Sequence, residues 1–244
     1  MPRGVVETRG RMKPDRLLVL DDLAAKIGNT SLGRPMRIAI DGRTAAGKTT
    51  LSDELAALIG NRSRPVIRTS VDGFHRPMAE RYARGRYSAE GYYYDARDLP
   101  AVMNLLLIPL GPRGSRMYRT ASFDLENDCP IEQESKLAPA DAVLIVDGTF
   151  LQRPELRDHW DLTIFVKTTE DTANRRAVGR DAQQSGGVDA VQKLYAERYR
   201  GAFDLYECLC APEEIADIVL MNDDFDRPEM LIQPGCLLAP SQSS

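Results

Sequence analysis

Hydrophobic residues are distributed along the chain in two kinds of pattern. Short apolar runs bounded by turn residues predict buried strands, whereas apolar residues three and four positions apart predict helices. Strands separated by helices indicate an α/β fold, a mostly parallel sheet with helices on both faces. The predicted strands are Met36–Ile40, Pro65–Val71, Ala142–Val146, Thr163–Val166 and Ile218–Met221. The predicted helices are Leu17–Ile27, Gly47 to about Leu58, Leu99–Leu107, Glu170–Gln183 and Val188–Cys208.

The length of 244 residues allows one large or two small domains. We expect a single domain over residues 1–244. Residues 1–34 are predicted to form an N-terminal arm followed by a helix. Residues 73–98 are rich in Arg, Tyr and Gly and have no apolar core of their own, so they predict an insertion on the substrate side of the sheet. Residues 170–187 are predicted to form a helical lid.

Composition is that of an ordinary globular chain, with 43% hydrophobic residues, 28% charged residues and a net charge of −4. These values exclude a largely disordered, collagen-like or coiled-coil protein and give no reason to expect a nucleic-acid partner. The four cysteines and two histidines lack the spacing of a zinc site. Neither a signal-peptide core nor an apolar run of about 20 residues is present. We expect a soluble, cytoplasmic protein without membrane contact, as a monomer or a homo-oligomer.

One loop carries the most specific motif of the chain. Residues 42–49 match the pattern G-x-x-x-x-G-K-[ST] between a predicted strand and a predicted helix. Glycines let backbone N–H groups surround phosphates, Lys48 supplies a positive charge to phosphoryl transfer, and Thr49 offers a hydroxyl to Mg²⁺. The alternative, a glycine-containing turn before an ordinary helix, does not explain motif and context together. The predicted ATP-binding residues are Gly42, Arg43, Thr44, Ala45, Ala46, Gly47, Lys48, Thr49 and Thr50.

Two aspartates follow predicted buried strands directly: Asp72 after Pro65–Val71 and Asp147 after Ala142–Val146. The carboxyl ends of parallel strands share one edge of a sheet, where ligands bind. We expect Asp147 to hold Mg²⁺ together with Thr49, and Asp72 to accept the proton of an attacking hydroxyl. The alternative is that each is a turn aspartate before a glycine. Two such aspartates in a phosphate-loop protein favour the catalytic interpretation.

Three arginines lie on the predicted lid helix: Arg175, Arg176 and Arg180. Arg176 and Arg180 are four residues apart and share a helix face. They are candidate catalytic residues of a lid that closes over the transferred phosphoryl group and offsets its charge. The alternative is a solvated face on which Asp171 and Asp181 are the partners of the arginines.

In their order and spacing, these segments resemble the uridine kinase family, within the wider group that includes pantothenate kinase and phosphoribulokinase. The resemblance runs from about Met36 to Asp224. It implies a P-loop kinase fold that uses ATP and Mg²⁺. Beyond the phosphate loop, the segments that carry it are Ser70–His75, Tyr94–Asp98, Val146–Gly148, Ile164–Val166 with Arg176–Asp181, and Tyr195–Tyr199 with Ala216–Val219.

The resemblance also implies roles for single residues. Asp72 stands where the family has its proposed base, and Asp95 where an aspartate binds ribose hydroxyls. In the family a Tyr followed by a His reads the pyrimidine; Tyr118 is present here, but Arg119–Phe123 contains no His. The resemblance therefore supports a small-molecule hydroxyl kinase more strongly than it supports uridine. His75 is a further candidate acceptor contact, with a turn histidine as the alternative.

We therefore expect an ATP- and Mg²⁺-dependent kinase that phosphorylates a hydroxyl of a small molecule, with a nucleoside such as uridine as the leading acceptor. A kinase of the same group acting on pantothenate or a sugar phosphate is the alternative. A nucleotide-dependent switch ATPase is a further alternative. It would need a water-orienting residue in place of an acceptor pocket, and the insertion 73–98 favours a pocket.

Overall fold

A six-stranded sheet forms the centre of the computed structural model, which describes residues 14–182 and 187–239. The strand order is β10-β9-β8-β1-β7-β2, and β10 runs antiparallel to β9 while the other neighbours pair in parallel. The mostly parallel sheet confirms the predicted α/β fold, and the five predicted strands are all present. The strands are β1 (Met36–Asp41), β2 (Val66–Ser70), β7 (Val143–Asp147), β8 (Leu162–Lys167), β9 (Ile218–Met221) and β10 (Glu229–Ile232).

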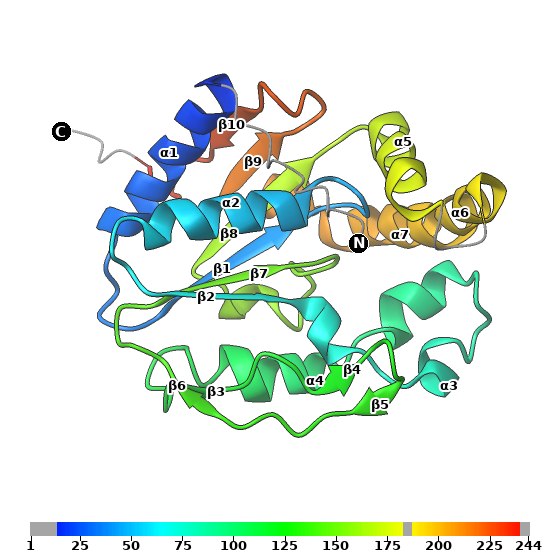
Figure 1. Ribbon diagram of the computed structural model, residues 1–244, viewed down its shortest axis with the longest axis horizontal. Helices are drawn as coiled ribbons and strands as arrows, with labels where there is room; N and C mark the ends of the chain where they lie inside the picture. The colour runs from blue at the N-terminus through cyan, green and yellow to red at the C-terminus, as the bar shows by residue number, and fades with distance from the viewer. Residues whose placement is uncertain (1–13, 183–186, 240–244) are drawn as a thin grey trace, which may run out of the picture.

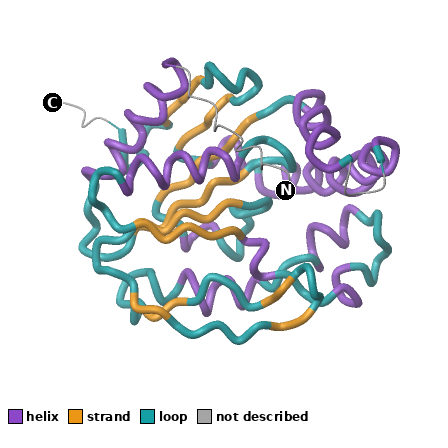
Figure 2. Tube along the Cα trace, in the orientation of Figure 1, coloured by secondary structure: helices purple, strands orange, loops and turns teal. Residues whose placement is uncertain are grey.

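Helices cover both faces of the sheet (Figures 1 and 2). The covering helices are α1 (Pro14–Asn29) and α2 (Lys48–Gly60) on one face, and α4 (Leu99–Ala101) with η3 (Val102–Leu107) on the other. Because side chains alternate along a strand, Ile38 and Ile40 of β1 pack in the cluster under α1 and α2, whereas Ala39 packs in the cluster under η3. All six residues of β1 are buried, as expected for the central strand of a parallel sheet.

The helices that follow β8 gather at the carboxyl ends of the central strands (Figure 1). They are α5 (Glu170–Asp181), α6 (Val188–Leu194), η5 (Tyr195–Arg200), α7 (Gly201–Cys210) and α8 (Pro212–Ile215). The helix predicted from Glu170 thus ends at Asp181. Residues 183–186 of the predicted lid and residues 1–13 of the predicted arm lie outside the described residues. Within the described ranges, no helix is both long and apolar enough to cross a bilayer.

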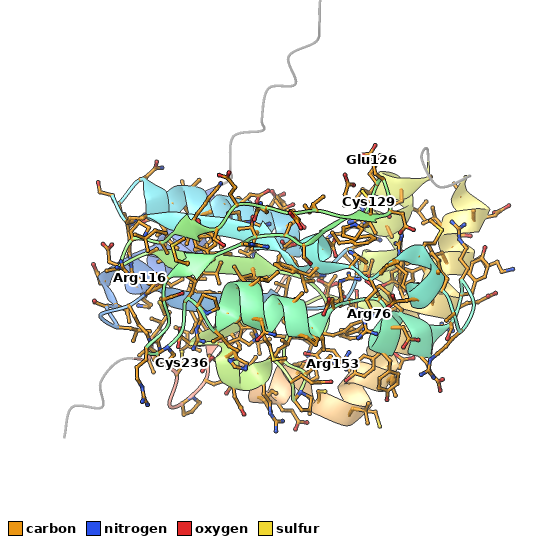
Figure 3. All side chains as sticks on the ribbon, turned by 90° about the horizontal axis from the view of Figure 1, so that it is seen from below. Arg76, Arg116, Glu126, Cys129, Arg153 and Cys236 are labelled. Carbon is orange, nitrogen blue, oxygen red and sulfur yellow. The ribbon has the colours of Figure 1, made fainter. Side chains whose placement is uncertain are left out.

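The predicted insertion, residues 73–98, lies at the same end of the sheet (Figure 1). Its elements are η1 (Val71–Phe74), α3 (Met78–Arg81) and η2 (Gly91–Asp95). Tyr93 of η2 packs against Phe150 and Tyr206 of the main body. Arg153, labelled in Figure 3, donates a hydrogen bond to the backbone oxygen of Tyr93. The insertion is therefore fixed to the loop that follows β7.

Residues between 108 and 141, for which the sequence predicts no element, contain two small antiparallel sheets (Figure 2). Glu126 and Cys129, labelled in Figure 3, lie on one of these hairpins, at the border of that view opposite Arg153. Strands of two residues carry no periodic pattern, so the sequence gives no signal for them. The pairs are β3 (Met117–Tyr118) with β6 (Lys136–Leu137), and β4 (Phe123–Asp124) with β5 (Cys129–Pro130); a short turn, η4 (Arg157–His159), precedes β8.

Candidate active site

The loop between β1 and α2 depends on two glycines. Gly42 has a φ of 144° and Gly47 a φ of 97°, conformations that residues with a Cβ rarely adopt. A Cβ on Gly42 would lie 2.5 Å from the backbone oxygen of Val166, and a Cβ on Gly47 would lie 2.6 Å from Nδ2 of Asn222. The two positions therefore need glycine, and the loop leads into α2 as a phosphate-binding loop does.

Lys48 is the first residue of α2, and its side chain is buried. Its Nζ donates a hydrogen bond to the backbone oxygen of Arg43 at 2.7 Å. Burial lowers the pKa of Lys48 to about 8, although nearby carboxylates, Asp41 foremost, act in the opposite direction. A desolvated ammonium held over this loop is stabilised when phosphate oxygens replace the lost water.

Thr49 and Asp147 meet next to Lys48. Oγ1 of Thr49 donates a hydrogen bond to Oδ2 of Asp147 at 2.7 Å, and Nη1 of Arg68 lies 2.7 Å from Oδ1 of Asp147. A hydroxyl and a carboxylate are the oxygen ligands that Mg²⁺ prefers, with water and substrate phosphates completing the shell. Within the described residues, no group of three or more His, Cys, Asp or Glu could hold a metal by itself. The pair therefore fits a metal ion that binds together with a nucleotide.

Asp72 lies in η1, directly after β2, and its side chain is 60% exposed. Nη2 of Arg97 donates a hydrogen bond to Oδ1 of Asp72 at 2.7 Å. Desolvation opposes ionisation of Asp72, but the positive charges of Arg97 and Lys48 outweigh it and lower the pKa of the carboxyl. Asp72 is therefore ionised at neutral pH, and Oδ2 has no hydrogen-bond donor among the described residues.

His75 orients Arg97. Nδ1 of His75 lies 2.8 Å from the backbone oxygen of Asp72, and Nε2 lies 2.5 Å from Nη1 of Arg97. Because a guanidinium can only donate, Nε2 accepts and Nδ1 carries the proton. Burial and the charge of Arg97 lower the pKa of His75 to about 4, so the ring is neutral at physiological pH. His75 thus positions the arginine that binds Asp72.

These side chains line one cavity of about 260 Å³ at the carboxyl end of the sheet. The predicted site residues in its wall are Thr44, Ala45, Lys48, Thr49, Asp72, His75, Asp147 and Arg180. Wall residues to which the sequence assigned no role include Arg81, Tyr82, Arg97, Thr149 and Arg198. The cavity therefore brings residues of the phosphate loop, both strand-end aspartates and Arg180 together, and its wall contains three further arginines.

Three further residues of the predicted phosphate loop, Arg43, Ala46 and Thr50, do not line the first cavity. The guanidinium of Arg43 lies over the ring of Phe203, 4.5 Å from its centroid. Ala46 is buried, and its backbone oxygen accepts a hydrogen bond from Asn222. Thr50 lies in the wall of a second cavity, which shares Ala45, Lys48, Thr49 and Arg180 with the first.

Of the three cavity arginines to which the sequence analysis assigned no role, Arg198 is the one whose burial the sequence pattern indicates. Val191, Tyr195 and Ala202 are buried residues at helical spacing, and Arg198 occupies the intervening position of the same stripe. An arginine on a buried helix face is unusual and indicates a specific partner. Arg81 and Arg97 lie on or beside short helical turns without such a pattern, so nothing in the sequence singles them out.

Two residues that the resemblance linked to the acceptor lie elsewhere. Oδ2 of Asp95 accepts a hydrogen bond from Nε of Arg84 at 2.8 Å, and Asp95 is not part of the cavity wall. Tyr118 is buried in the hydrophobic cluster that contains Phe74 and Leu106. The ion pair and the apolar packing keep both side chains away from the cavity, so this geometry does not support the acceptor contacts expected of them.

Arg176 and Arg180, the two candidate catalytic arginines of α5, have different surroundings. Nη2 of Arg176 donates a hydrogen bond to the backbone oxygen of Asn222 at 2.8 Å, which fastens α5 to the end of β9. Arg180 donates two hydrogen bonds to Asp181 and lies in the walls of both the first cavity and the second, which contains Phe225. Pairing with Asp181 agrees with the solvated alternative, whereas the place in both walls agrees with a lid role.

Comparison with known proteins adds to this geometry. Residues 37–221 match the sequence profile of the Phosphoribulokinase / Uridine kinase family. The chain belongs to this family. It is 27% identical to uridine-cytidine kinase B of Dictyostelium discoideum over 194 residues, which cover 79% of this chain and 77% of that protein. It is 25% identical to uridine-cytidine kinase 2-B of Danio rerio over 198 residues, which cover 77% and 73% of the two chains.

The fold is shared with solved structures. A protein described as a possible uridine kinase from Bacillus stearothermophilus superimposes with a TM-score of 0.65 at 24% identity, covering 84% of this chain and 97% of that one. The family match confirms the resemblance seen in the sequence: this chain is a P-loop kinase of the uridine kinase family.

Proposed function

We propose that this kinase transfers the γ-phosphoryl group of ATP to a hydroxyl of a small molecule in the cytoplasm. The observation that supports this most is that Lys48, the Thr49–Asp147 pair and Asp72 line one cavity. Phosphoryl transfer requires mainly positioning and charge stabilisation. Cations, a metal-binding pair and a carboxylate with one oxygen left for the acceptor can supply both from one cavity.

The phosphate loop forms the nucleotide side of this site. Its backbone N–H groups and Nζ of Lys48 bind oxygens of the β- and γ-phosphates. Thr49 and Asp147 are the residues that would hold Mg²⁺, which offsets phosphate charge when bound. Arg180 lies beside Lys48 in both cavity walls, where its charge stabilises the transferred group.

Asp72 forms the acceptor side. Arg97 binds Oδ1 of Asp72, so the second oxygen is left for the acceptor. The acceptor hydroxyl forms a bond to the γ-phosphorus while the bond from that phosphorus to the β,γ-bridging oxygen breaks. The hydroxyl proton passes to Asp72, and ADP leaves.

Two classes of acceptor are supported by different observations. The relatives named uridine-cytidine kinases favour a nucleoside such as uridine. The cavity wall instead favours the alternative acceptors named in the sequence analysis, pantothenate or a sugar phosphate. Its three arginines, Arg81, Arg97 and Arg198, can bind a carboxylate or a phosphate.

ADP formation with and without an added acceptor tests the proposal. We expect ADP to form only when an acceptor is present, and Lys48→Ala to remove most of this activity while the circular dichroism spectrum stays unchanged. ADP released at an equal rate with water alone would instead favour a nucleotide-dependent switch. Full activity of Lys48→Ala at saturating ATP would remove the phosphate loop from the mechanism.

A further inference from the structure

Arg198 is a buried cation without a carboxylate partner in the described part of the chain. Its exposure is 4%, and no Asp or Glu oxygen of residues 14–182 and 187–239 lies within 4.0 Å of its guanidinium. Burial lowers the pKa of Arg198, as it does for any cation deprived of water. A buried unpaired charge is costly, so a protein retains one where a ligand supplies the opposite charge.

The surroundings of Arg198 hold its guanidinium in a fixed place. Nη1 donates hydrogen bonds to the backbone oxygens of Arg86 at 2.9 Å and Ser88 at 3.2 Å. The guanidinium carbon lies 5.0 Å from the ring centroid of Tyr82 and 4.9 Å from that of Tyr92. Nε and Nη2 of Arg198 have no acceptor among the residues that the structure describes. One edge of a preorganised fork is thus left for a ligand.

The same two rings contact the other added arginines. The guanidinium of Arg81 lies 5.2 Å from the centroid of Tyr82, and that of Arg97 lies 5.6 Å from the centroid of Tyr92. Arg81 and Arg97 are 7% exposed and already bind Asp128 and Asp72, respectively. Arg198 therefore shares one aromatic ring with each of two arginines that already have a carboxylate partner.

The position of Arg198 distinguishes the acceptor from ATP. The cavity that contains Arg198 also contains Asp72 and Arg97. The second cavity, with Phe225, shares Ala45, Lys48, Thr49 and Arg180 with the first but does not contain Arg198. All the hydrogen bonds and ring contacts given above for Arg198 are to residues 82–92 of the insertion. Arg198 therefore lines the cavity that contains Asp72, the residue at which the hydroxyl is proposed to react.

We propose that Arg198 binds an anionic group of the acceptor, a carboxylate or a phosphate, so that the substrate is an acidic hydroxyl compound and not a neutral nucleoside. This inference rests on the proposed kinase function and specifies its acceptor. Arg97 holds Asp72 at the hydroxyl, and Arg198, which contacts the same ring of Tyr92 as Arg97, holds the acid of the same molecule.

Matched pairs of acceptors test this by kinetics. We would compare glycerol with D-glycerate and glycerol 3-phosphate, and ribose with ribose 5-phosphate, alongside uridine. The variants are Arg198→Gln, Arg198→Lys, and the control Arg200→Gln, whose arginine is half-exposed and pairs with Glu170. We expect Arg198→Gln to lower kcat/KM for acidic acceptors by roughly 10- to 100-fold, mostly through KM. The kcat/KM of Arg198→Lys for acidic acceptors should lie between the values of the wild type and of Arg198→Gln. The kcat/KM of Arg200→Gln should equal that of the wild type.

A binding experiment tests the anion site even if the acceptors compared above are poor substrates. With the phosphate loop saturated by Mg²⁺ and a non-hydrolysable ATP analogue, inorganic phosphate and acetate are titrated separately by calorimetry. We expect at least one to bind the wild type and Arg200→Gln, and to bind Arg198→Gln about tenfold more weakly or not at all. Whichever anion binds identifies the acid as phosphate or carboxylate.

The outcomes distinguish failure of the anion site at Arg198 from failure of the proposed kinase function. The anion site is overturned if neither anion binds the wild type, or if Arg198→Gln leaves the ratio of kcat/KM for acidic and neutral acceptors unchanged. Equal loss of activity toward both kinds of acceptor would give Arg198 a structural role only. Phosphorylation of uridine with a higher kcat/KM than that of every acidic acceptor would leave the kinase proposal intact and contradict the anion site. Failure of the ATP analogue to bind would contradict the kinase proposal itself.

Discussion

At the residue scale, the proposed acceptor side of the site depends on the connected side chains of Asp72, Arg97 and His75. Neutral His75 accepts a hydrogen bond from Arg97, and Arg97 donates to one oxygen of Asp72. This fixes the carboxylate without protonating it, since the charges of Arg97 and Lys48 lower its pKa. Asp72 is therefore available as a base over the neutral pH range.

Replacing Asp72 by Asn tests this role. Asn keeps the size and the acceptor oxygen for Arg97 but cannot take a proton, so we expect kcat to fall by roughly 10²- to 10⁴-fold. Acceptor KM and affinity for the ATP analogue should change little. Steady-state kinetics with the control Asp158→Asn, a highly exposed aspartate, measures the difference. An unchanged kcat would place the base elsewhere.

Nucleotide affinity should depend on pH through Lys48. Its pKa is lowered to about 8 in the free protein, whereas a bound triphosphate favours the charged form. Above pH 8 binding therefore requires uptake of a proton, and the Kd of the Mg²⁺–ATP analogue should rise by up to about tenfold per pH unit. Calorimetry in buffers of different ionisation enthalpy measures the proton uptake. Equal affinity from pH 7 to 10 would show that Lys48 does not titrate in this range.

At the scale of elements, the phosphate loop is held by the end of β9 and by α1. Nδ2 of Asn222, the residue after β9, donates a hydrogen bond to the backbone oxygen of Ala46 at 2.7 Å. Oδ1 of Asn222 accepts from Arg16 of α1, which also binds Glu54 of α2. Strand, loop and both helices therefore fix one loop conformation, which a nucleotide meets already formed.

Gly47→Ala should disturb this arrangement. The new Cβ would meet Asn222 at 2.6 Å, and alanine is strained at a φ of 97°. We expect the free energy of unfolding to fall by about 1–3 kcal/mol and the affinity for the ATP analogue to decrease.

The matched control is Gly60→Ala at the end of α2, where a Cβ has no neighbour within 4 Å. It should leave stability unchanged or raise it by up to about 1 kcal/mol. Urea denaturation measures both variants. If they were equally stable, the contact with Asn222 would not constrain the loop.

At the scale of the whole molecule, local patterns predicted the fold well and the site in part. Buried strands such as Met36–Ile40 have continuous apolar runs, and the loop motif lies between strand and helix, so both could be recognised. Asp72 and Asp147 meet because parallel strands end at one edge. The antiparallel strand β10 was not predicted, because it is short and only partly buried.

The arginine-lined part of the cavity could not be predicted in the same way. Arg81 and Arg198 come from segments more than a hundred residues apart and meet through the ring of Tyr82. No local pattern encodes such a meeting, because it depends on how the insertion packs on η5. The pairing of Asp95 with Arg84 could not be predicted for a related reason, since it is an interaction within the insertion that no local pattern encodes.

The destination of the γ-phosphoryl group of ATP decides whether the protein is a small-molecule kinase. The most direct measurement uses ATP labelled with ¹⁸O in its γ-phosphoryl oxygens, with mass spectrometry of the acceptor and of inorganic phosphate after turnover. We predict that the label appears in a phosphorylated acceptor at the rate of ADP formation, and that Asp72→Asn slows this transfer. Label found only in inorganic phosphate, at the same rate with and without an acceptor, would contradict the assignment of this protein as a small-molecule kinase.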